Sequence, residues 1–379
     1  MKFLSVDRLN AGMVLAQDVF LDSNPTQAYL RRGIRLSAEV IERLTVLGVS
    51  RVAVRDEAAA PATPAIPPRL LQTARSSIIA PKPTVDHKLR DNTLDSLHTV
   101  FSDIWINDNG FRGEPDSLDD VNSMVEKLVG TIMRDRAALV NINDLKSFDD
   151  YTYHHSLSVA VLSIGIGQQM GISTRQLNKL GLAAIMHDIG KTAVPIEIIR
   201  KPSKLTDSEF ALMKYHSKAG SSYLIGSSIG DEWLWGAVLG HHEKLDGTGY
   251  PNGLKGEQIP LWSRIISVAD VYDALTSHRP YRQPMPATEA LEYIMGGVGT
   301  AFDYDVVQAL VRKVAPYPVG SCVELSDGSY GLVVAVTHPA RPVVEILGRG
   351  DIVDLQEDRQ YLNVLIRRQV MPVELGQIG

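Results

Sequence analysis

Histidine and aspartate side chains suited to binding metal ions recur through the middle of this sequence. The adjacent pair His187-Asp188 closes an apolar segment, in the run HDIGK. An imidazole binds one ion, and a carboxylate beside it can bridge to a second ion. One pair does not make a site, so other segments must supply the remaining ligands.

Five further residues complete a candidate ligand set, each expected near a helix end or on a buried helix face. The seven candidates are His155, His187, Asp188, His216, His241, His242 and Asp270. A single histidine on an apolar helix face is usually a core residue with its hydrogen bonds satisfied. Five imidazoles and two carboxylates in one core are costly to bury unless cations bind them. Mixed imidazole and carboxylate ligands suit iron, manganese, zinc or nickel rather than calcium, and seven ligands with a bridging Asp188 divide over two ions.

Helices must position these side chains, because apolar residues recur at helical spacing from about residue 84 to residue 315. Ser173 with Gln176, and Thr206 with Glu209, are typical of the caps that open helices. The first of these helices is predicted to lead to His187, and the second is predicted to carry His216. A third helix is expected to end at His241-His242. A fourth, from about residue 261 to residue 277, is expected to carry Asp270. The prediction is a helical bundle with imidazole and carboxylate groups projecting inward.

The two ends of the chain have a different composition from the middle. Residues 1–57 contain strand-like runs at 13–16 and 51–54 around a helical pattern at 37–48, which predicts a small α+β accessory domain. Residues 58–83 include APATPAIPP and are predicted to form a Pro/Ala-rich linker. Residues 84–148 are read as a helical lead-in, 149–316 as the metal-binding catalytic domain, and 317–379 as a small β subdomain. The predicted fold class is therefore mainly α.

Composition and charge exclude several classes of protein. The 379 residues carry a net charge of −6, so no broad basic surface for DNA or an anionic membrane is expected, and an anionic ligand needs a local basic site. The single cysteine, Cys322, excludes an internal disulfide and a cysteine-based zinc site. We expect neither a signal peptide nor a membrane span, and we expect a cytoplasmic protein. The sequence does not indicate an oligomeric state.

Three motifs together resemble the HD-GYP family of cyclic di-GMP phosphodiesterases. They are HDIGK, HHEKLDGTGYP and ADVYDALTSHRPYR, within about residues 150 to 315. An HD pair alone marks a wide superfamily of metal phosphohydrolases, whereas the three motifs in this order and spacing are highly specific. The resemblance implies an HD-type bundle that hydrolyses cyclic di-GMP to linear pGpG, with GMP as a further product, using a hydroxide that bridges the metal ions. It also implies a role in bacterial second-messenger signalling, in biofilm formation and motility.

The resemblance assigns roles to individual residues. It implies that the seven candidates hold two divalent ions, with iron or manganese preferred, and that Asp188 bridges them. Lys191 matches the lysine that reaches the phosphate and joins Asp188 in catalysis. The implied substrate-binding residues are Lys191, Tyr250, Arg279 and Arg282. Some family members bind a third ion through a glutamate one helical turn before the first histidine. Tyr151 occupies that position here, so two ions are expected.

Two other functions stay open on the sequence alone. The first is a cyclic di-GMP receptor with weak catalysis that acts through protein contacts, which the N-terminal domain and linker favour. Receptors of this kind usually lack part of the HD or HHE motifs, and none of it is missing here. The second is another HD phosphohydrolase that acts on nucleotides or (p)ppGpp. The GYP and RPYR segments argue against it, because that chemistry does not need them.

Overall fold

The computed structural model describes residues 2–10, 51–54, 84–103, 105–107, 110–112, 117–134, 151–201, 203–227, 231–277 and 284–370, with single positions elsewhere between 13 and 49 and at 140. The chain divides into two compact units, Met1–Ala65 and Ile66–Gly379. Each unit is described by itself.

The first unit contains a short antiparallel pair of strands. β1 (Lys2–Ser5) pairs with β2 (Arg51–Val54), and the 3₁₀ turn η1 (Val6–Arg8) follows β1. The predicted strand at 51–54 is confirmed. In the run at 13–16, Leu15 forms an isolated bridge with Val54, and the Ala16 amide donates to the Ala53 carbonyl at 2.8 Å. Most of the predicted helix at 37–48 lies outside the described residues, although Ile41 and Leu44 are helical.

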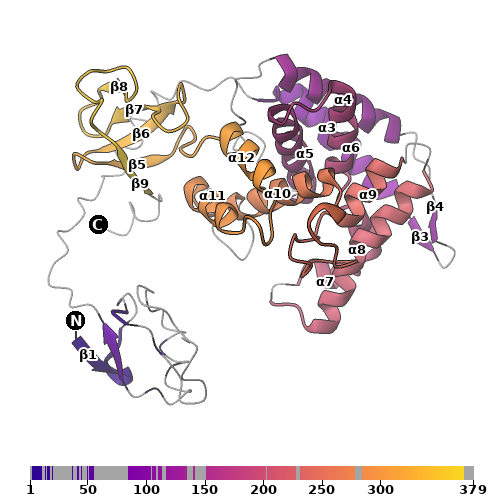
Figure 1. The fold of residues 1–379 in the computed structure, drawn as a ribbon, viewed down its shortest axis with the longest axis horizontal. Coiled ribbons are helices and arrows are strands. Elements are labelled where there is room, and N and C mark those ends of the chain that lie inside the picture. Colours follow the sequence, from indigo (N-terminus) through magenta and orange to yellow (C-terminus); the bar gives the residue numbers. More distant parts are fainter. Residues whose placement is uncertain are drawn as a thin grey trace. The chain divides into compact units, whose positions relative to one another are not determined.

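The second unit begins with a helical region (Figure 1). Its elements are α3 (His87–Asp103), α4 (Ser117–Arg134), α5 (Tyr151–Gln169), α6 (Thr174–Ile185), η3 (Ile189–Ala193), α7 (Ile196–Ile199), α8 (Asp207–Ile225), α9 (Glu232–Gly240), η4 (Gly256–Gln258), α10 (Leu261–Thr276), α11 (Ala287–Gly296) and α12 (Tyr304–Lys313). The mainly α prediction is confirmed. The hairpin of β3 (Trp105–Asn107) and β4 (Gly110–Arg112) was not predicted, because the apolar stripe of α3 continues to Ile104.

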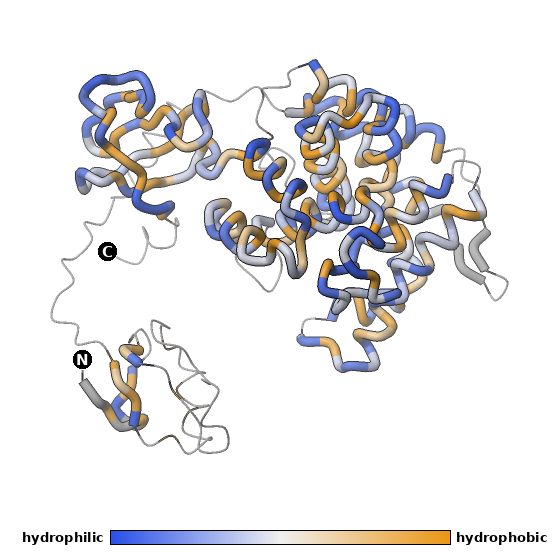
Figure 2. The backbone as a smooth tube through the Cα atoms, viewed as in Figure 1, coloured by the Kyte–Doolittle hydropathy of each residue, from blue (hydrophilic) through white to orange (hydrophobic). Residues whose placement is uncertain are grey.

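Helix α5 lies at the centre of the helical region. It contacts α3, α4, α6, α10 and α12. Its run from Leu157 to Ile166 is apolar on nearly every side and fully buried, and it appears largely orange in Figure 2. A helix that is apolar all round can only be buried, and each large side chain removed from water stabilises the fold by about 1.5–3 kcal/mol. The buried helix holds His155, in its second turn, at a fixed place.

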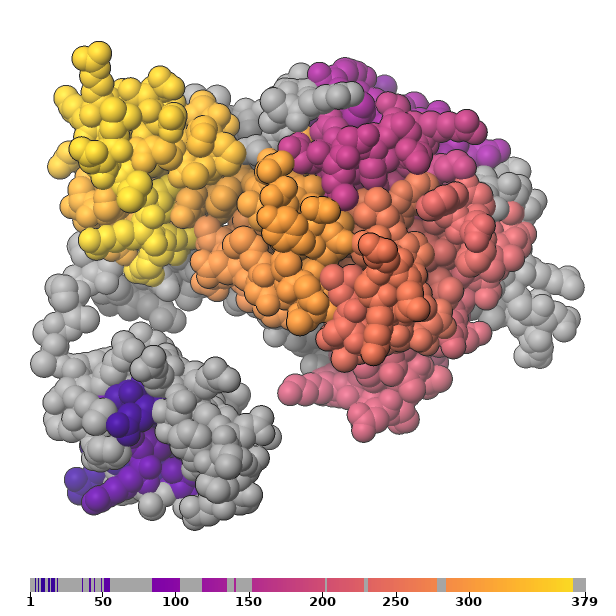
Figure 3. All heavy atoms as spheres, viewed as in Figure 1, coloured from indigo at the N-terminus to yellow at the C-terminus, as the bar shows by residue number. Residues whose placement is uncertain are grey.

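Helix caps fix where the next segments begin. The Ser173 hydroxyl accepts the Gln176 amide at 3.4 Å, and Thr206 forms a reciprocal capping box with Glu209, so both predicted caps are confirmed. Lys201 Nζ adds an ion pair of 2.6 Å to the Glu209 carboxylate. These caps open α6 and α8. In Figure 3 the segments of α8 and α9 (salmon) adjoin those of α10 to α12 (orange) on one face.

The second unit ends in a five-stranded antiparallel sheet with the order β8-β7-β6-β5-β9. Its strands are β5 (Cys322–Leu325), β6 (Tyr330–Ala335), β7 (Val343–Ile346), β8 (Ile352–Asp354) and β9 (Ile366–Val370). The small C-terminal β region is confirmed. Strand β9 was not predicted, because the polar residues Arg-Arg-Gln at its centre interrupt the alternation of apolar and polar residues that marks a strand. In the described part of the chain, no helix is long and apolar enough to cross a membrane.

Candidate metal centre

Five segments of the helical region bring the seven candidate ligands together. His155 comes from α5, and His187 and Asp188 follow the end of α6. His216 lies in the middle of α8, His241 and His242 follow α9, and Asp270 lies on α10. His155, His187, Asp188, His216 and His241 are each at most 5% exposed. Segments separated by up to 115 positions therefore place imidazole and carboxylate groups in one buried cluster.

Asp188 lies between two groups of ligand atoms. Its Oδ2 is 3.3 Å from His187 Nε2 and 3.9 Å from His155 Nε2. Its Oδ1 is 3.5 Å from His216 Nε2. Since the two oxygens of one carboxylate face different imidazoles, Asp188 has the orientation of a bridging ligand.

The two groups are each compact enough to surround one cation. The ligand atoms of His155, His187 and Asp188 lie within 4.8 Å of one another, and so do those of His216, His241 and His242. The Asp270 carboxylate joins the first group, with Oδ1 3.2 Å from His155 Nε2. The arrangement can therefore hold two cations that share Asp188.

Three histidines have the tautomer that a metal ligand needs. Each places Nδ1 within hydrogen-bond distance of the main-chain oxygen three residues earlier: His187 with Ala184 at 2.8 Å, His216 with Met213 at 2.6 Å, and His241 with Val238 at 2.6 Å. A carbonyl oxygen only accepts, so Nδ1 carries the proton and Nε2 presents its lone pair to the cluster. The Nε2 atom of His187 is buried and has no hydrogen-bond partner. A divalent cation would satisfy that atom.

Electrostatics keeps most of the imidazoles neutral and Asp188 ionised. Burial lowers the pKa of His241 well below its usual value, and the neighbouring histidines add to this. Burial also lowers the pKa of His242, to about 4. Burial alone would raise the pKa of Asp188, but His187 and Lys191 hold it well below its usual value. Neutral imidazole and ionised carboxylate are the forms that bind cations.

Asp273, one turn after Asp270 on α10, is a buried partner of His155 that the sequence reasoning missed. His155 Nδ1 lies 2.7 Å from Asp273 Oδ2, and the Ser277 hydroxyl donates to Asp273 Oδ1 at 3.0 Å. Burial lowers the pKa of His155, but Asp270 and Asp273 outweigh it and raise this pKa to about 9. Asp273 thus orients the His155 ring toward the cluster. The available signal was its spacing of three from Asp270, which puts both carboxylates on one helix face.

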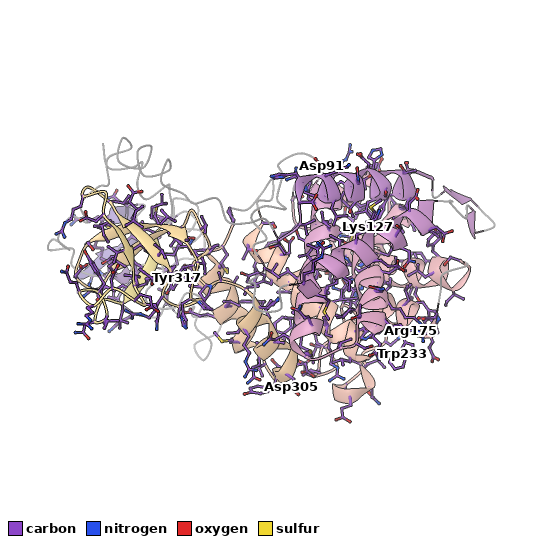
Figure 4. The ribbon with its side chains drawn as sticks, turned by 90° about the horizontal axis from the view of Figure 1, so that it is seen from above. Asp91, Lys127, Arg175, Trp233, Asp305 and Tyr317 are labelled. Carbon is purple, nitrogen blue, oxygen red and sulfur yellow. The ribbon has the colours of Figure 1, made fainter. Side chains whose placement is uncertain are left out.

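Replacing Asp273 with asparagine is expected to lower the affinity of the centre for Mn²⁺ by about 10- to 100-fold, because the carboxylate that orients a ligating imidazole is lost. Titration of the metal-free protein with Mn²⁺ measures the effect. Asp305→Asn is the matched control, since Asp305 is exposed on α12 at the outer surface in Figure 4. Equal Mn²⁺ affinity of the two variants would contradict the orienting role.

A glycine lets the segment after Asp188 pack directly against α8. A Cβ on Gly190 would lie 1.9 Å from the main-chain oxygen of His216 and 2.4 Å from the Gly220 nitrogen. Only glycine allows η3 to approach α8 this closely. The same turn places Lys191 Nζ 2.5 Å from Asp188 Oδ2, with the lysine side chain 31% exposed. Lys191 is therefore accessible from solvent at the edge of the cluster.

Glu243 holds the loop that carries Tyr250. The Glu243 side chain is buried, and its two oxygens accept the amide hydrogens of Asn252 at 2.7 Å and Leu254 at 3.0 Å. The Tyr250 amide donates to the His242 carbonyl at 3.2 Å, which sets the two rings 4.7 Å apart. Gly249 is required in this loop, because a Cβ there would lie 2.4 Å from the Lys244 nitrogen. The sequence reasoning gave Glu243 no role, although it follows the paired histidines in the HHE run.

The change Glu243→Gln is expected to lower the melting temperature, because a glutamine amide group must face a main-chain amide hydrogen and leave it without an acceptor. An unsatisfied buried donor costs about 1–3 kcal/mol, or ~2–10 °C in a domain of this size. Thermal denaturation measures the shift. Glu257→Gln, at an exposed position of η4, is the control. Identical melting of the two variants would argue against Glu243 as the anchor of this loop.

Some expected site residues lie outside the described part of the chain. Arg279 and Arg282 are among these, and the side chain of Tyr151 is too. The roles assigned to the two arginines, and the limit of two ions drawn from Tyr151, stay predictions.

Known proteins resemble the region that contains the cluster. Residues 138–306 match the family model of the HD domain. A cyclic di-GMP phosphodiesterase of Pseudomonas aeruginosa is 41% identical over 213 residues, which is 56% of this chain and 51% of the relative. The 3'3'-cGAMP-specific phosphodiesterase 1 of Vibrio cholerae is 38% identical over 194 residues, 50% of this chain and 43% of the relative. The chain thus spans about half the length of these curated relatives.

A solved structure supports the fold. It is described as an HDG"Y"P protein from Bdellovibrio bacteriovorus, and it aligns with a TM-score of 0.50 at 20% identity, over 82% of this chain and 97% of that one. At this identity the likeness concerns the fold alone, and the HD-type helical architecture is confirmed. Residues 138–306 therefore match the HD domain, and their cluster and their GYP and RPYR motifs are similar to those of the HD-GYP family.

Proposed function

We propose that this protein is a metal-dependent phosphodiesterase that hydrolyses cyclic di-GMP to linear pGpG. The observation that carries the proposal is the position of Asp188, whose two oxygens face two separate groups of imidazoles. A carboxylate shared by two cation sites suits a two-metal centre, which stabilises the attacking and leaving oxygens of in-line attack on a phosphodiester. The relatives named for cyclic dinucleotide hydrolysis support this substrate class.

The centre would hold two divalent ions. His155, His187, Asp188 and Asp270 would bind one ion. Asp188, His216, His241 and His242 would bind the other. The neutral Nε2 atoms and the buried, unpartnered Nε2 of His187 fit this assignment. Iron or manganese suits this mixture of nitrogen and oxygen ligands.

The ions would supply Lewis acidity and an activated water molecule. Side chains of the protein would position the ligands and stabilise the charge on the phosphate. Lys191, beside Asp188 and open to solvent, would offset the charge that develops on the phosphate. Asp273 would keep the His155 ring in line, and Glu243 would keep Tyr250 at the edge of the centre. By resemblance, Arg279 and Arg282 would bind a second phosphate or a guanine edge.

The test is turnover by the metal-loaded protein. We expect anaerobically purified protein with Mn²⁺ or Fe²⁺ to convert cyclic di-GMP to pGpG, and more slowly to GMP, as followed by chromatography. A panel with 3'3'-cGAMP and (p)ppGpp checks the substrate class, and we expect cyclic di-GMP to have the highest kcat/KM. A fully metallated protein that forms no linear product from any of these compounds would overturn the proposal.

A second candidate is a cyclic di-GMP receptor that acts through a protein partner. Its support is the first unit, Met1–Ala65, which is compact by itself and carries none of the seven candidate ligands. This function predicts binding of cyclic di-GMP without product, and a partner that is lost when residues 1–65 are deleted. Steady turnover at a rate typical of enzymes would exclude it as the main function.

A further inference from the structure

An exposed aromatic residue stands beside the metal centre. Phe210, on α8, is 45% exposed, and its ring centroid lies 6.2 Å from that of Tyr250, edge to face at 83°. The Tyr250 ring in turn lies 4.7 Å from His242 and 6.5 Å from His216. The ring contacts therefore lead from the candidate ligand His242 through Tyr250 to the exposed Phe210.

A lysine completes this group. Lys214 follows Phe210 by one helical turn, and its Nζ lies 5.1 Å from the Phe210 centroid and 5.8 Å from the Tyr250 centroid. A cation at this distance is attracted to both rings and orders them. Among the described residues, no carboxylate forms an ion pair with Lys214, so its charge is available to an anionic ligand. We call Phe210, Lys214 and Tyr250 the aromatic platform.

A lone exposed phenylalanine needs no functional explanation, because apolar atoms make up much of any protein surface. Leu212, on the same helix, is similarly exposed at 51%. Phe210 differs because it contacts a second aromatic ring that itself contacts two candidate ligands, with an ammonium group above both rings. Flat rings with an adjacent cation are the features that bind a nucleobase and its phosphate.

We propose that the aromatic platform binds a purine base of the substrate while its phosphodiester lies at the metal centre. Because the two rings stand at 83° to each other, a base that stacks on the exposed Phe210 ring meets Tyr250 edge to face, and Lys214 offers its charge to the phosphate of the same nucleotide. The inference rests on the proposed function, and it deepens it by naming the residues that recognise the nucleoside part.

The variant Phe210→Ala is expected to raise KM for cyclic di-GMP about 5- to 100-fold, the range that alanine substitution at base-stacking positions produces. We expect kcat to change by less than about twofold, since the substitution leaves the metal ligands in place. Phe210→Trp should keep KM near that of the unchanged protein, because it retains a stacking surface. Lys214→Met should raise KM in the same direction.

Two controls separate base binding from general damage. Leu212→Ala removes a side chain of similar exposure from the same helix and should leave KM unchanged. Methyl p-nitrophenyl phosphate is a phosphodiester without a nucleobase, so the unchanged protein and Phe210→Ala should hydrolyse it with equal kcat/KM. The proposed role of the aromatic platform would be overturned by an unchanged KM for cyclic di-GMP in Phe210→Ala, or by an equal loss of kcat/KM on both substrates.

Failure of the platform and failure of the proposed function give different results. If the metal-loaded protein turns over cyclic di-GMP and Phe210→Ala does so with the same KM, only the platform is wrong. If no turnover occurs, calorimetric titration with cyclic di-GMP replaces the kinetic assay. Weaker binding by Phe210→Ala than by Leu212→Ala would then support the platform, and equal binding or none by the unchanged protein would overturn it.

Discussion

Replacing Asp188 with alanine is expected to abolish turnover of cyclic di-GMP and to reduce the amount of bound metal. Asp188 faces both groups of imidazoles, through Oδ2 toward His187 and through Oδ1 toward His216. Loss of a residue that merely orients a ligand costs about 10- to 100-fold, so loss of a ligand shared by two ions should cost at least about 100-fold. Product formation under saturating substrate and metal analysis of the purified protein are the measurements.

Two further variants sharpen this result. Asp188→Asn keeps the shape of the side chain but removes its charge, so it should lose metal almost as Asp188→Ala does. Asp119→Ala removes an exposed carboxylate from the first turn of α4 and should leave both metal content and turnover unchanged. Turnover by Asp188→Ala with unchanged metal content would show that the carboxylate does not bridge.

The helices of the HD domain could be predicted because their sequence carries local signals. The apolar run of α5 and the capping pairs Ser173/Gln176 and Thr206/Glu209 depend only on residues within one or two turns. Strand β9 carries no such signal, whereas the run of the β3–β4 hairpin does contain a turn signal, Asn109-Gly110, which was not used. β9 is defined by pairing with β5 across more than 40 residues, and its polar sequence is allowed because it has only one neighbouring strand.

The candidate ligands could also be identified from the sequence, because few residue types bind metal and five imidazoles in one core call for a common explanation. Their partners could not. Asp273 and Glu243 are ordinary acidic residues in the sequence, and their importance comes from contacts with His155 and with main-chain amides of a distant loop. Gly190 looks like a turn residue until the backbone of α8 is placed against it. These roles depend on tertiary distances that no local pattern contains.

A site of this kind also needs residues that bind no ligand but hold the helices in place. The candidate histidines lie on helices or directly after them, so their positions depend on how those helices pack. The packing of η3 against α8 joins the segment carrying His187 and Asp188 to the helix carrying His216. A change at this contact should therefore alter both groups of ligands at once, without removing any ligand.

The variant Gly190→Ala tests this coupling and should have the second largest effect. The added Cβ would overlap the main-chain oxygen of His216, and since main chain lies on both sides of the contact, neither side chain can rotate away. Overpacking of this kind costs about 1–3 kcal/mol or more, and a displacement of about 1 Å at a reactive centre lowers the rate on the order of 100-fold. We expect a lower melting temperature, weaker Mn²⁺ binding and a kcat reduced on the order of 100-fold.

Gly236→Ala, on α9, is the matched control, because an added Cβ there meets no atom within 4 Å. Alanine is also the better helix former by about 1 kcal/mol, so this variant should be as stable as the unchanged protein or more so, with unaltered kcat. A Gly190→Ala protein with unchanged Mn²⁺ affinity and kcat would mean that η3 can move away from α8 without displacing Asp188. If it melts lower but keeps its activity once loaded with metal, the contact serves stability alone. Loss of metal affinity together with activity, in a protein that still folds, is the result that ties the position of Asp188 to the close approach of the two backbones.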